Sequence, residues 1–484
     1  MLFNSIQFLF FFPIVTILYF LLPHKFRWLH LLISSCVFYM AFIPVYIFIL
    51  LFTIIIDYIA GIMIENASSA RRKFFLILSI VANVGVLCVF KYYNFFADNI
   101  DALFHTLHLT LNPVPYLNII LPLGLSFHTF QAMSYTIEVY RGNQKAERHF
   151  GIYSLYVMFY PQLVAGPIER PQNLLHQFYE KHSFDYTRVT NGLKLMAWGL
   201  FQKVVIADRL ALVADNVFDH SYNFHGLSLA VGMVFFTFQI YCDFSGYSDI
   251  AIGTAQVMGF TLMRNFERPY LSRSIPEFWR RWHISLSTWF KDYLYISLGG
   301  NRVTIPRWYF NIFIVFLISG LWHGANWTFV AWGALHGIYM VAFNIYEPVK
   351  NKLPEKLRST TLFKVTGTVF TFLLVAIAWT FFRAKRIGIA IYIIINLFKN
   401  WHFSLYSIRN TMVDLNLTVS DILFSVSLIL FLISVHYYQE KIGSLTRMIN
   451  SKPAIIRWSV YYTVIIALIF FGVYKDRQFI YFQF

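Results

Sequence analysis

Charged residues are scarce in this sequence, and their scarcity decides the class of protein. Asp, Glu, Lys and Arg make up only 13% of the 484 residues, whereas 58% are hydrophobic and 20% are aromatic. Soluble domains typically contain about 25% charged and about 45–50% apolar residues. A soluble globular protein is therefore excluded, and the composition is typical of an integral membrane protein.

Cysteine is rare as well. Cys36, Cys88 and Cys242 lie far apart in apolar sequence, without the spacing of metal ligands. We therefore expect no disulfide framework and no bound metal. Internal repeats, low-complexity tracts and long disordered linkers are also lacking. These absences predict one integral-membrane domain, residues 1–477, followed by a short aromatic tail, residues 478–484.

Long apolar stretches are abundant. A spanning helix needs about 20 mostly apolar residues, and we count roughly eleven to thirteen segments that could span or partly enter a membrane. The clearest are 6–22, 31–52, 74–90, 227–240, 310–321, 363–382, 422–435 and 458–473. The first has no basic region before it and no small-residue cleavage site after it, so we expect a retained helix and not a signal peptide. The sequence predicts an all-α polytopic membrane protein.

The formal net charge of +16 comes mainly from short basic loops between apolar segments. Such loops face the cytoplasm under the positive-inside rule, which places 24–27, 70–73, 141–148 and 440–457 inside. The stretch 94–115 has two aspartates and no Lys or Arg, which suits the outside. Counting from these loops puts the N-terminus and the C-terminal tail on the extracytoplasmic side of the membrane.

The least hydrophobic long stretch, residues 263–307, alternates aromatic and aliphatic residues with arginines, among them Arg280 and Arg281. This pattern is typical of amphipathic helices in the cytoplasmic headgroup layer. The segment is either a simple interfacial anchor or, in addition, a basic docking face for a phosphate-bearing or acidic donor.

Polar residues in apolar sequence are costly and mark candidate functional sites. His323 and Asn326 in "GLWHGANWTFVAWGALHG" (320–337) would share one face if this stretch were helical. A histidine is a suitable general base at neutral pH, although a membrane histidine often serves packing alone. His336 and His128 fit the packing interpretation.

Two further motifs interrupt apolar sequence. Asp243 and Asp249 in "YCDFSGYSDIAIG" could bind a metal or a proton as in a transporter, or could tie helices together, which we favour. Three prolines in "FYPQLVAGPIERP" (159–171) exclude a straight helix and predict a broken or re-entrant element, with Glu169 and Arg170 at its mouth.

Together these motifs resemble the membrane-bound O-acyltransferase (MBOAT) family, in particular its bacterial alginate O-acetyltransferase branch. The residues that carry the resemblance are "FYPQLVAGPIERP", "FQIYCDFSGYSDIAIG", "RRWHISLSTWFKDYLYISLGGNR", "GLWHGANWTFVAWGALHG" and the terminal "FIYFQF". It implies a ring of membrane helices around a thin centre pierced by a tunnel. It also implies that His323 is the catalytic histidine and that His283 is a second functional residue. Trp322, Asn326, Asp243 and Asp249 become candidates for tunnel-lining or supporting roles.

The tail acquires a role through the same resemblance, because a similar Phe-x-Tyr-Phe ending is a suggested acyl relay in related proteins. Residues 475–481 could span about 23 Å if extended, at about 3.3 Å each, enough to fold back into a central cavity. The phenol of Tyr481, with an ordinary pKa near 10, would keep much of a thioester's transfer potential as an acetyl ester.

The resemblance implies a cytoplasmic thioester donor, acetyl-CoA or an acyl carrier, and a bacterial cytoplasmic (inner) membrane location. His323 would be the general base for attack by Tyr481 or by a nucleophile on a partner. The sequence has no G-x-S-x-G motif, so we expect a periplasmic SGNH-type transferase or esterase to complete transfer to a polysaccharide such as alginate or peptidoglycan. The alternatives are D-alanyl or other acyl transfer to an envelope glycan, a proton-coupled transporter or channel built on the two aspartates, and a scaffold for a soluble transferase.

Overall fold

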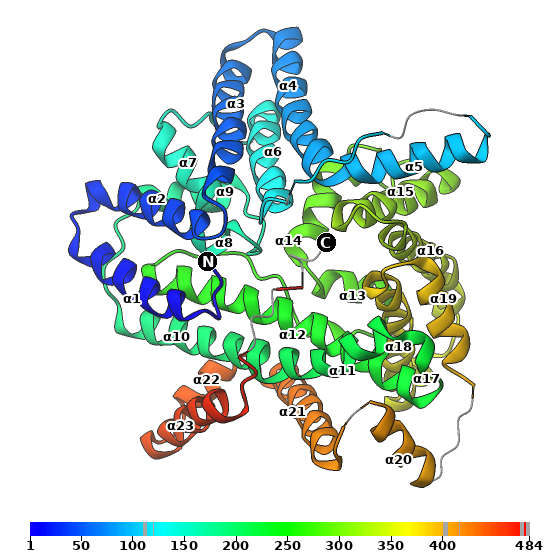
Figure 1. Cartoon of the computed structure of the whole chain (residues 1–484). Helices are drawn as coiled ribbons and strands as arrows, with labels where there is room; N and C mark the ends of the chain where they lie inside the picture. Colours follow the sequence, from blue (N-terminus) through cyan, green and yellow to red (C-terminus); the bar gives the residue numbers. More distant parts are fainter. Residues whose placement is uncertain (110–113, 120, 400–404, 416, 475–478, 481–484) are drawn as a thin grey trace. The chain divides into compact units, whose positions relative to one another are not determined.

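The computed structural model of this chain is built from helices (Figure 1). The structure describes residues 1–109, 114–119, 121–399, 405–415, 417–474 and 479–480, and these ranges contain no β-strand. Helices predominate because a helix satisfies its own backbone hydrogen bonds where no water is present. The predicted all-α class is confirmed.

Eight helical stretches within these ranges are long and apolar enough to cross a membrane. They are Pro44–Asn66, Ser69–Thr106, Leu227–Met258, Ile305–His323, Trp327–Asn351, Thr361–Arg383, Val419–Ile442 and Ala454–Phe471. Ile6–Leu21 and Ile387–Asn396 are shorter apolar helices. The larger number of segments expected from the sequence also included partly inserted ones, such as the stretch around 159–171 that the fold breaks into short helices. The chain is a multi-pass membrane protein.

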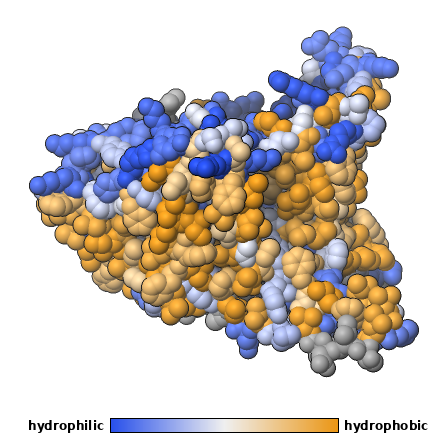
Figure 2. Space-filling model, turned by 90° about the horizontal axis from the view of Figure 1, so that it is seen from above, coloured by the Kyte–Doolittle hydropathy of each residue, from blue (hydrophilic) through white to orange (hydrophobic). Residues whose placement is uncertain are grey.

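Hydrophobic side chains cover much of the surface (Figure 2). In this view hydrophobic residues form a broad area, and hydrophilic residues gather along its margin. Exposed examples include Leu9, Phe48, Phe370 and Phe470, which come from four different helices. An apolar surface of this extent is suited to lipid contact.

The chain divides into two compact units, of which the first comprises Met1–Met196 and Tyr247–Met263. Its first helices are α1 (Ile6–Leu21), α2 (His24–Met40), η1 (Pro44–Tyr46), α3 (Ile47–Asn66), α4 (Ser69–Leu87), η2 (Cys88–Tyr92), α5 (Tyr93–Thr106) and α6 (Leu125–Arg141). The shorter α7 (Phe150–Met158), α8 (Tyr160–Leu163), α9 (Pro171–Leu174) and η3 (Leu175–Tyr179) follow, and α10 (Tyr186–Leu200) begins in this unit.

The proline-rich stretch 159–171 is broken as predicted, into α8, an irregular segment and the start of α9. Pro161 and Pro171 both lie in the first turn of a short helix, where the missing N–H costs nothing. Glu169 does not mark an open mouth, because it is fully buried and its Oε1 accepts a hydrogen bond from Met263 N at 2.5 Å. A buried carboxylate needs such donors, and the irregular backbone supplies them.

The second unit comprises Ala197–Gly246 and Arg264–Phe484. It contains the π-helical turn η4 (Phe201–Ala207), α11 (Asp208–Asp219), η5 (Ser221–Asn223), the first part of α12 (Leu227–Met258), η6 (Pro269–Leu271), α13 (Ile275–Arg281), α14 (Ile284–Trp289) and η7 (Phe290–Tyr295). The C-terminal helices are α15 (Ile305–His323), α16 (Trp327–Asn351), α17 (Glu355–Arg358), α18 (Thr361–Arg383), α19 (Ile387–Asn396), α20 (Leu405–Asp414), α21 (Val419–Ile442), α22 (Leu445–Asn450) and α23 (Ala454–Phe471).

The segment 263–307 is divided into short elements. It forms the short helices α13 and α14 and the turn η7, and Trp279, Trp282, Leu286 and Trp289 are buried in the second unit. The short elements allow many aromatic side chains to pack inward, whereas one continuous surface helix would expose one face along its whole length. Arg280 is among the residues of this segment that do remain exposed.

Helices α15 and α16 form a hairpin whose backbones approach closely at two glycines. A Cβ atom on Gly320 would lie 2.3 Å from Phe329 O, and one on Gly333 would lie 2.4 Å from Phe316 O. Small residues at a crossing let membrane helices pack backbone to backbone. The two glycines therefore allow the close packing of the hairpin, whose first helix ends at His323.

We expect Gly333→Ala to destabilise the protein, because the added methyl group meets a backbone carbonyl that cannot rotate away. Overpacking of this kind costs about 1–3 kcal/mol. The measurement is the thermal unfolding temperature in detergent. Gly85→Ala in α4 is the matched control, because a Cβ there meets nothing within 4 Å. Equal unfolding temperatures for the two variants would contradict the close crossing.

Candidate active site

His323 is the last residue of α15, and the chain breaks directly after it. Gly324 has extended backbone, and Asn326 caps the start of α16 by accepting a hydrogen bond from Thr328 N at 3.0 Å. The amide of Asn326 also donates to Lys385 O at 3.2 Å. His323 and Asn326 therefore do not share a helical face, because α15 ends at His323 and Asn326 has extended backbone before α16. The structure assigns Asn326 a capping role.

Aromatic rings surround the imidazole of His323. Its ring centroid lies 4.9 Å from that of Trp322, 5.0 Å from Trp332 and 5.3 Å from Phe382. The side chain is only 5% exposed. Helices α15, α16 and α18 supply these residues, so the hairpin and the helix after it build the environment of His323 together. This environment limits the access of water to the imidazole.

His283 occupies the junction between α13 and α14, in a left-handed backbone conformation with φ 42°. Such a conformation is uncommon outside glycine and clusters at functional sites. Asn265 supports the junction, because its carbonyl oxygen accepts from Ile284 N at 2.9 Å and its Oδ1 accepts from Ser285 Oγ at 2.6 Å. Burial lowers the pKa of His283 to about 3, so its imidazole is neutral at pH 7.

Trp322 and Phe244 connect the surroundings of the two histidines to the tail. The ring centroid of Trp322 lies 4.9 Å from His323 and 6.4 Å from His283. The ring of Phe244, on α12, lies 4.7 Å from His283 and 5.6 Å from Phe479. The structure thus places His323, Trp322, His283 and the described end of the tail in one aromatic cluster.

The C-terminal tail folds back into the second unit at Phe479 and Ile480, which are 2% and 3% exposed. The backbone N–H of Ile480 donates to Asp243 Oδ2 at 2.8 Å. Tyr481, the predicted acyl relay, lies outside the described residues. Phe479 and Ile480, the described residues of the tail, are therefore buried.

Asp243 is paired with a lysine within the protein. Its Oδ1 lies 2.7 Å from Lys203 Nζ, and the same ammonium lies 2.9 Å from Asp208 Oδ1. Burial alone would lower the pKa of Lys203, but the two carboxylates outweigh it and raise the pKa, so the lysine is charged. Asp249 lies further along α12 and is half-buried. A helix-tying role for Asp243, which the sequence favoured over an ion site, agrees with these contacts.

The sequence reasoning did not identify Lys203. The signal was present, since Lys203 is the one charged residue in the apolar run "LFQKVVIA" (200–207). Trp332 and Phe382 were also missed, because a membrane protein contains many aromatic residues and only the fold brings these two to His323. Within the described residues, no group of three or more His, Cys, Asp or Glu side chains could hold a metal ion.

The other predicted site residues have different surroundings. Arg281 is held by Glu277 at 2.8 Å and by Glu440 of α21 at 2.9 Å, so it ties α13 to α21, whereas Arg280 is exposed. Among the packing histidines, His336 Nδ1 accepts from Trp279 Nε1 at 3.3 Å. His128 Nε2 lies 2.5 Å from Thr53 Oγ1. Of the two arginines expected to dock the donor, only Arg280 projects to the surface without those pairings.

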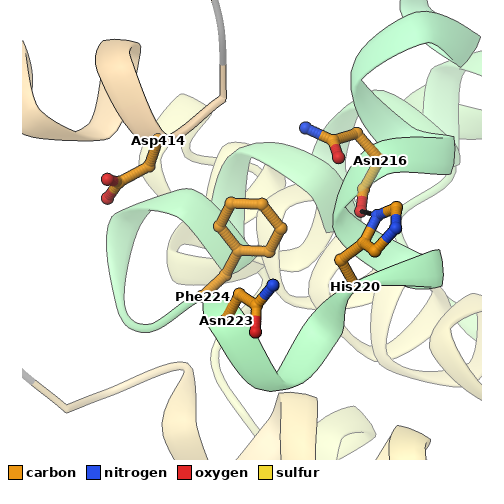
Figure 3. Close-up of a pocket in the computed structure, with 5 residues that line it drawn as sticks. All are labelled: Asn216, His220, Asn223, Phe224 and Asp414. Carbon is orange, nitrogen blue, oxygen red and sulfur yellow. Dashed lines mark hydrogen bonds between the residues drawn. The ribbon is translucent and has the colours of Figure 1, made fainter.

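A separate pocket of about 360 Å³ lies at the end of α11 (Figure 3). It is lined by Asn216, His220, Asn223, Phe224 and Asp414. The ring nitrogen Nδ1 of His220 lies 3.2 Å from Asn216 O, which turns the imidazole back toward its own helix. None of the aromatic residues around His323 lines this pocket.

Comparison with known proteins relates the chain to one family. The profile of the membrane-bound O-acyltransferase family matches residues 149–381, which include Lys203, Asp243, His283 and His323. The chain is 40% identical to the probable alginate O-acetylase AlgI of Azotobacter vinelandii, over 84% of this chain and 80% of that protein.

Two further relatives act on other cell-envelope polymers by name. The chain is 37% identical to the peptidoglycan O-acetyltransferase of Helicobacter pylori, over 81% of this chain and 78% of that protein. It is 25% identical to the teichoic acid D-alanyltransferase of Bacillus subtilis, over 55% of this chain and 70% of that protein. The chain belongs to the membrane-bound O-acyltransferase family, and it is an acyltransferase.

Proposed function

We propose that this acyltransferase moves an acetyl group from a cytoplasmic thioester across the membrane, for O-acetylation of an extracytoplasmic polysaccharide. The donor is acetyl-CoA or an acyl carrier thioester, and the acceptor is an alginate-like polysaccharide or peptidoglycan. The observation that carries the proposal is the aromatic cluster in which the buried His323 and the inserted tail both take part.

The proposed reaction has two transfers. The phenolic oxygen of Tyr481 attacks the thioester carbonyl while His323 accepts the phenolic proton, and the thiol leaves with a proton. An acceptor hydroxyl then displaces the acetyl group from Tyr481 and restores the phenol. Exclusion of water by Trp322, Trp332 and Phe382 protects the acetyl ester from hydrolysis between the two steps. Neutral His283, beside Trp322, orients the donor.

The proposed topology follows the basic loops of the sequence and places the N- and C-termini outside the bacterial cytoplasmic membrane. The acetyl group then reaches the extracytoplasmic side, where an SGNH-type partner carries it to the polysaccharide. Acetyl is preferred over D-alanyl because the alginate O-acetylase and peptidoglycan O-acetyltransferase relatives are 37–41% identical, against 25–30% for the teichoic acid D-alanyltransferases. The pairing of Asp243 with Lys203 argues against a transporter built on a free carboxylate.

We expect His323→Ala to abolish acetyl transfer while the protein is inserted at normal abundance. Loss of a general base lowers the rate by about 10²–10⁴-fold. The measurement is transfer of labelled acetyl from acetyl-CoA by the purified protein with its partner. His336→Ala removes a buried imidazole of equal size from the same aromatic region and should retain activity per folded molecule. Normal rates in His323→Ala would exclude it as the base.

Tyr481→Phe tests the relay. The substitution keeps the ring but removes the nucleophile, so transfer to the acceptor should fall by orders of magnitude. If the tail only docks a partner, the loss of one hydrogen bond costs about 0.5–1.5 kcal/mol, which corresponds to a two- to tenfold effect. Mass spectrometry of the C-terminal peptide, after incubation with donor and no acceptor, should find one acetyl group on Tyr481. Absence of the adduct in an active preparation would contradict the relay.

Arg280→Glu should raise KM for a phosphate-bearing donor more than it lowers kcat. Arg280 is exposed, and the substitution reverses the charge at a position on the proposed cytoplasmic face. The measurement is steady-state kinetics with acetyl-CoA at two salt concentrations. Lys356→Glu makes the same charge change in the exposed helix α17 and controls for net charge. An unchanged KM in Arg280→Glu would show that Arg280 does not bind the donor, and the segment 263–307 would then serve only as a membrane anchor.

A further inference from the structure

After α23 the structure describes residues 472–474 and, in the tail, 479–480. Both parts contact the region around η4 and α12. At the near end, Val473 N donates to Val204 O at 2.9 Å and Arg209 Nη2 donates to Phe471 O at 3.2 Å. At the far end, Ile480 N donates to Asp243 Oδ2 at 2.8 Å. On the C-terminal side, all three hydrogen bonds use backbone atoms, so they do not depend on the side chains there.

The far contact is to a buried charge cluster. Lys203, Asp208 and Asp243 are each at most 5% exposed, and the single lysine lies between the two carboxylates. One ammonium balances only one of two carboxylates, so the cluster stabilises further N–H donors. Ile480 supplies such a donor. The tail therefore supplies a hydrogen-bond donor to a buried charge, in addition to the apolar packing of Phe479.

The geometry of this cluster is set by η4, the π-helical turn that carries both Lys203 and Val204. π-helical turns within α-helices are rare and often occur at functional sites. Contact with α12 is close, because a Cβ on Gly246 would lie 2.6 Å from Gly199 O. Ser245 Oγ also donates to Gln202 Oε1 at 2.5 Å. One turn thus holds the start of the tail through Val204 and its end through Lys203 and Asp243.

We propose that Lys203 and Asp243 form a seat for the C-terminal tail, in which Asp243 binds the backbone at Ile480 and Lys203 holds the carboxylate in place. Both are positioning residues. The seat stands on the contacts above, whereas its purpose rests on the proposed function: Tyr481 follows Ile480 directly, and Phe479 packs on Phe244, which contacts His283.

Hydrogen exchange of the C-terminal peptide, measured by mass spectrometry on the full-length protein in detergent, tests the seat. Asp243→Asn should accelerate exchange of the tail amides about tenfold or more, because it replaces one of the two carboxylate oxygens by an NH2 group, which cannot accept from Lys203 or Ile480, and it removes the negative charge. Ile480→Pro should have a similar effect, because it removes the donated N–H without substituting Lys203, Asp208 or Asp243. Rates are corrected for the intrinsic exchange of each sequence.

Two matched controls distinguish binding of the tail by Asp243 from a salt bridge that only ties helices together. Asp208→Asn removes the other carboxylate on Lys203, is equally buried and does not bind Ile480, so the tail should stay protected. Ile480→Val keeps the N–H and a branched apolar side chain, and it should match the wild type. If Asp208→Asn releases the tail as much as Asp243→Asn, or if Ile480→Pro leaves exchange unchanged, the seat is overturned.

Acetyl transfer measured in parallel distinguishes the seat from the proposed function. Faster tail exchange together with lost transfer in Ile480→Pro supports both. Faster exchange with normal transfer leaves the seat in place and overturns the relay by Tyr481. Protected tails in Ile480→Pro and Asp243→Asn overturn the seat even if Tyr481→Phe is inactive, in which case the relay reaches the site by other contacts.

Discussion

The constraint on which the second unit depends is the need to pair polar groups on a buried membrane helix. Helix α12 is largely enclosed by protein, yet its second-unit part carries Asp243 and Ser245. Water does not reach these groups, so each needs a partner from the protein. Lys203 and Gln202 of η4 provide those partners, and the small Gly246 lets η4 and α12 approach closely enough for the pairs to form.

As a result, the buried charges and the two candidate catalytic histidines have different surroundings. The charges are held in the Lys203 cluster, whereas the two histidines lie among aromatic rings, with Trp322 next to both. Both imidazoles are buried, and the surrounding rings limit their contact with bulk water. The tail connects the two regions, because its backbone meets the charge cluster and its Phe479 meets the aromatic cluster through Phe244.

The breaks in the helices are as important for the site as the helices themselves. His323 ends α15, His283 occupies a left-handed junction, and Lys203 lies in a π-helical turn. All three side chains are buried. Irregular backbone in a membrane protein is tolerated where protein surrounds it.

The sequence alone determined the all-α membrane class and the break at the prolines of 159–171, because hydropathy and proline geometry are local properties of the chain. The functional roles of His323 and His283 stay predictions from the motifs. The tertiary structure decided that Asn326 caps α16, that Arg281 is tied to Glu440, that aromatic residues of 263–307 pack inward, and that Ile480 meets Asp243. These outcomes depend on residues far apart in the sequence. A buried charge specifies that a partner must exist, but only the packing of helices decides that the partner of Asp243 is Lys203, forty residues earlier, and the backbone of the tail.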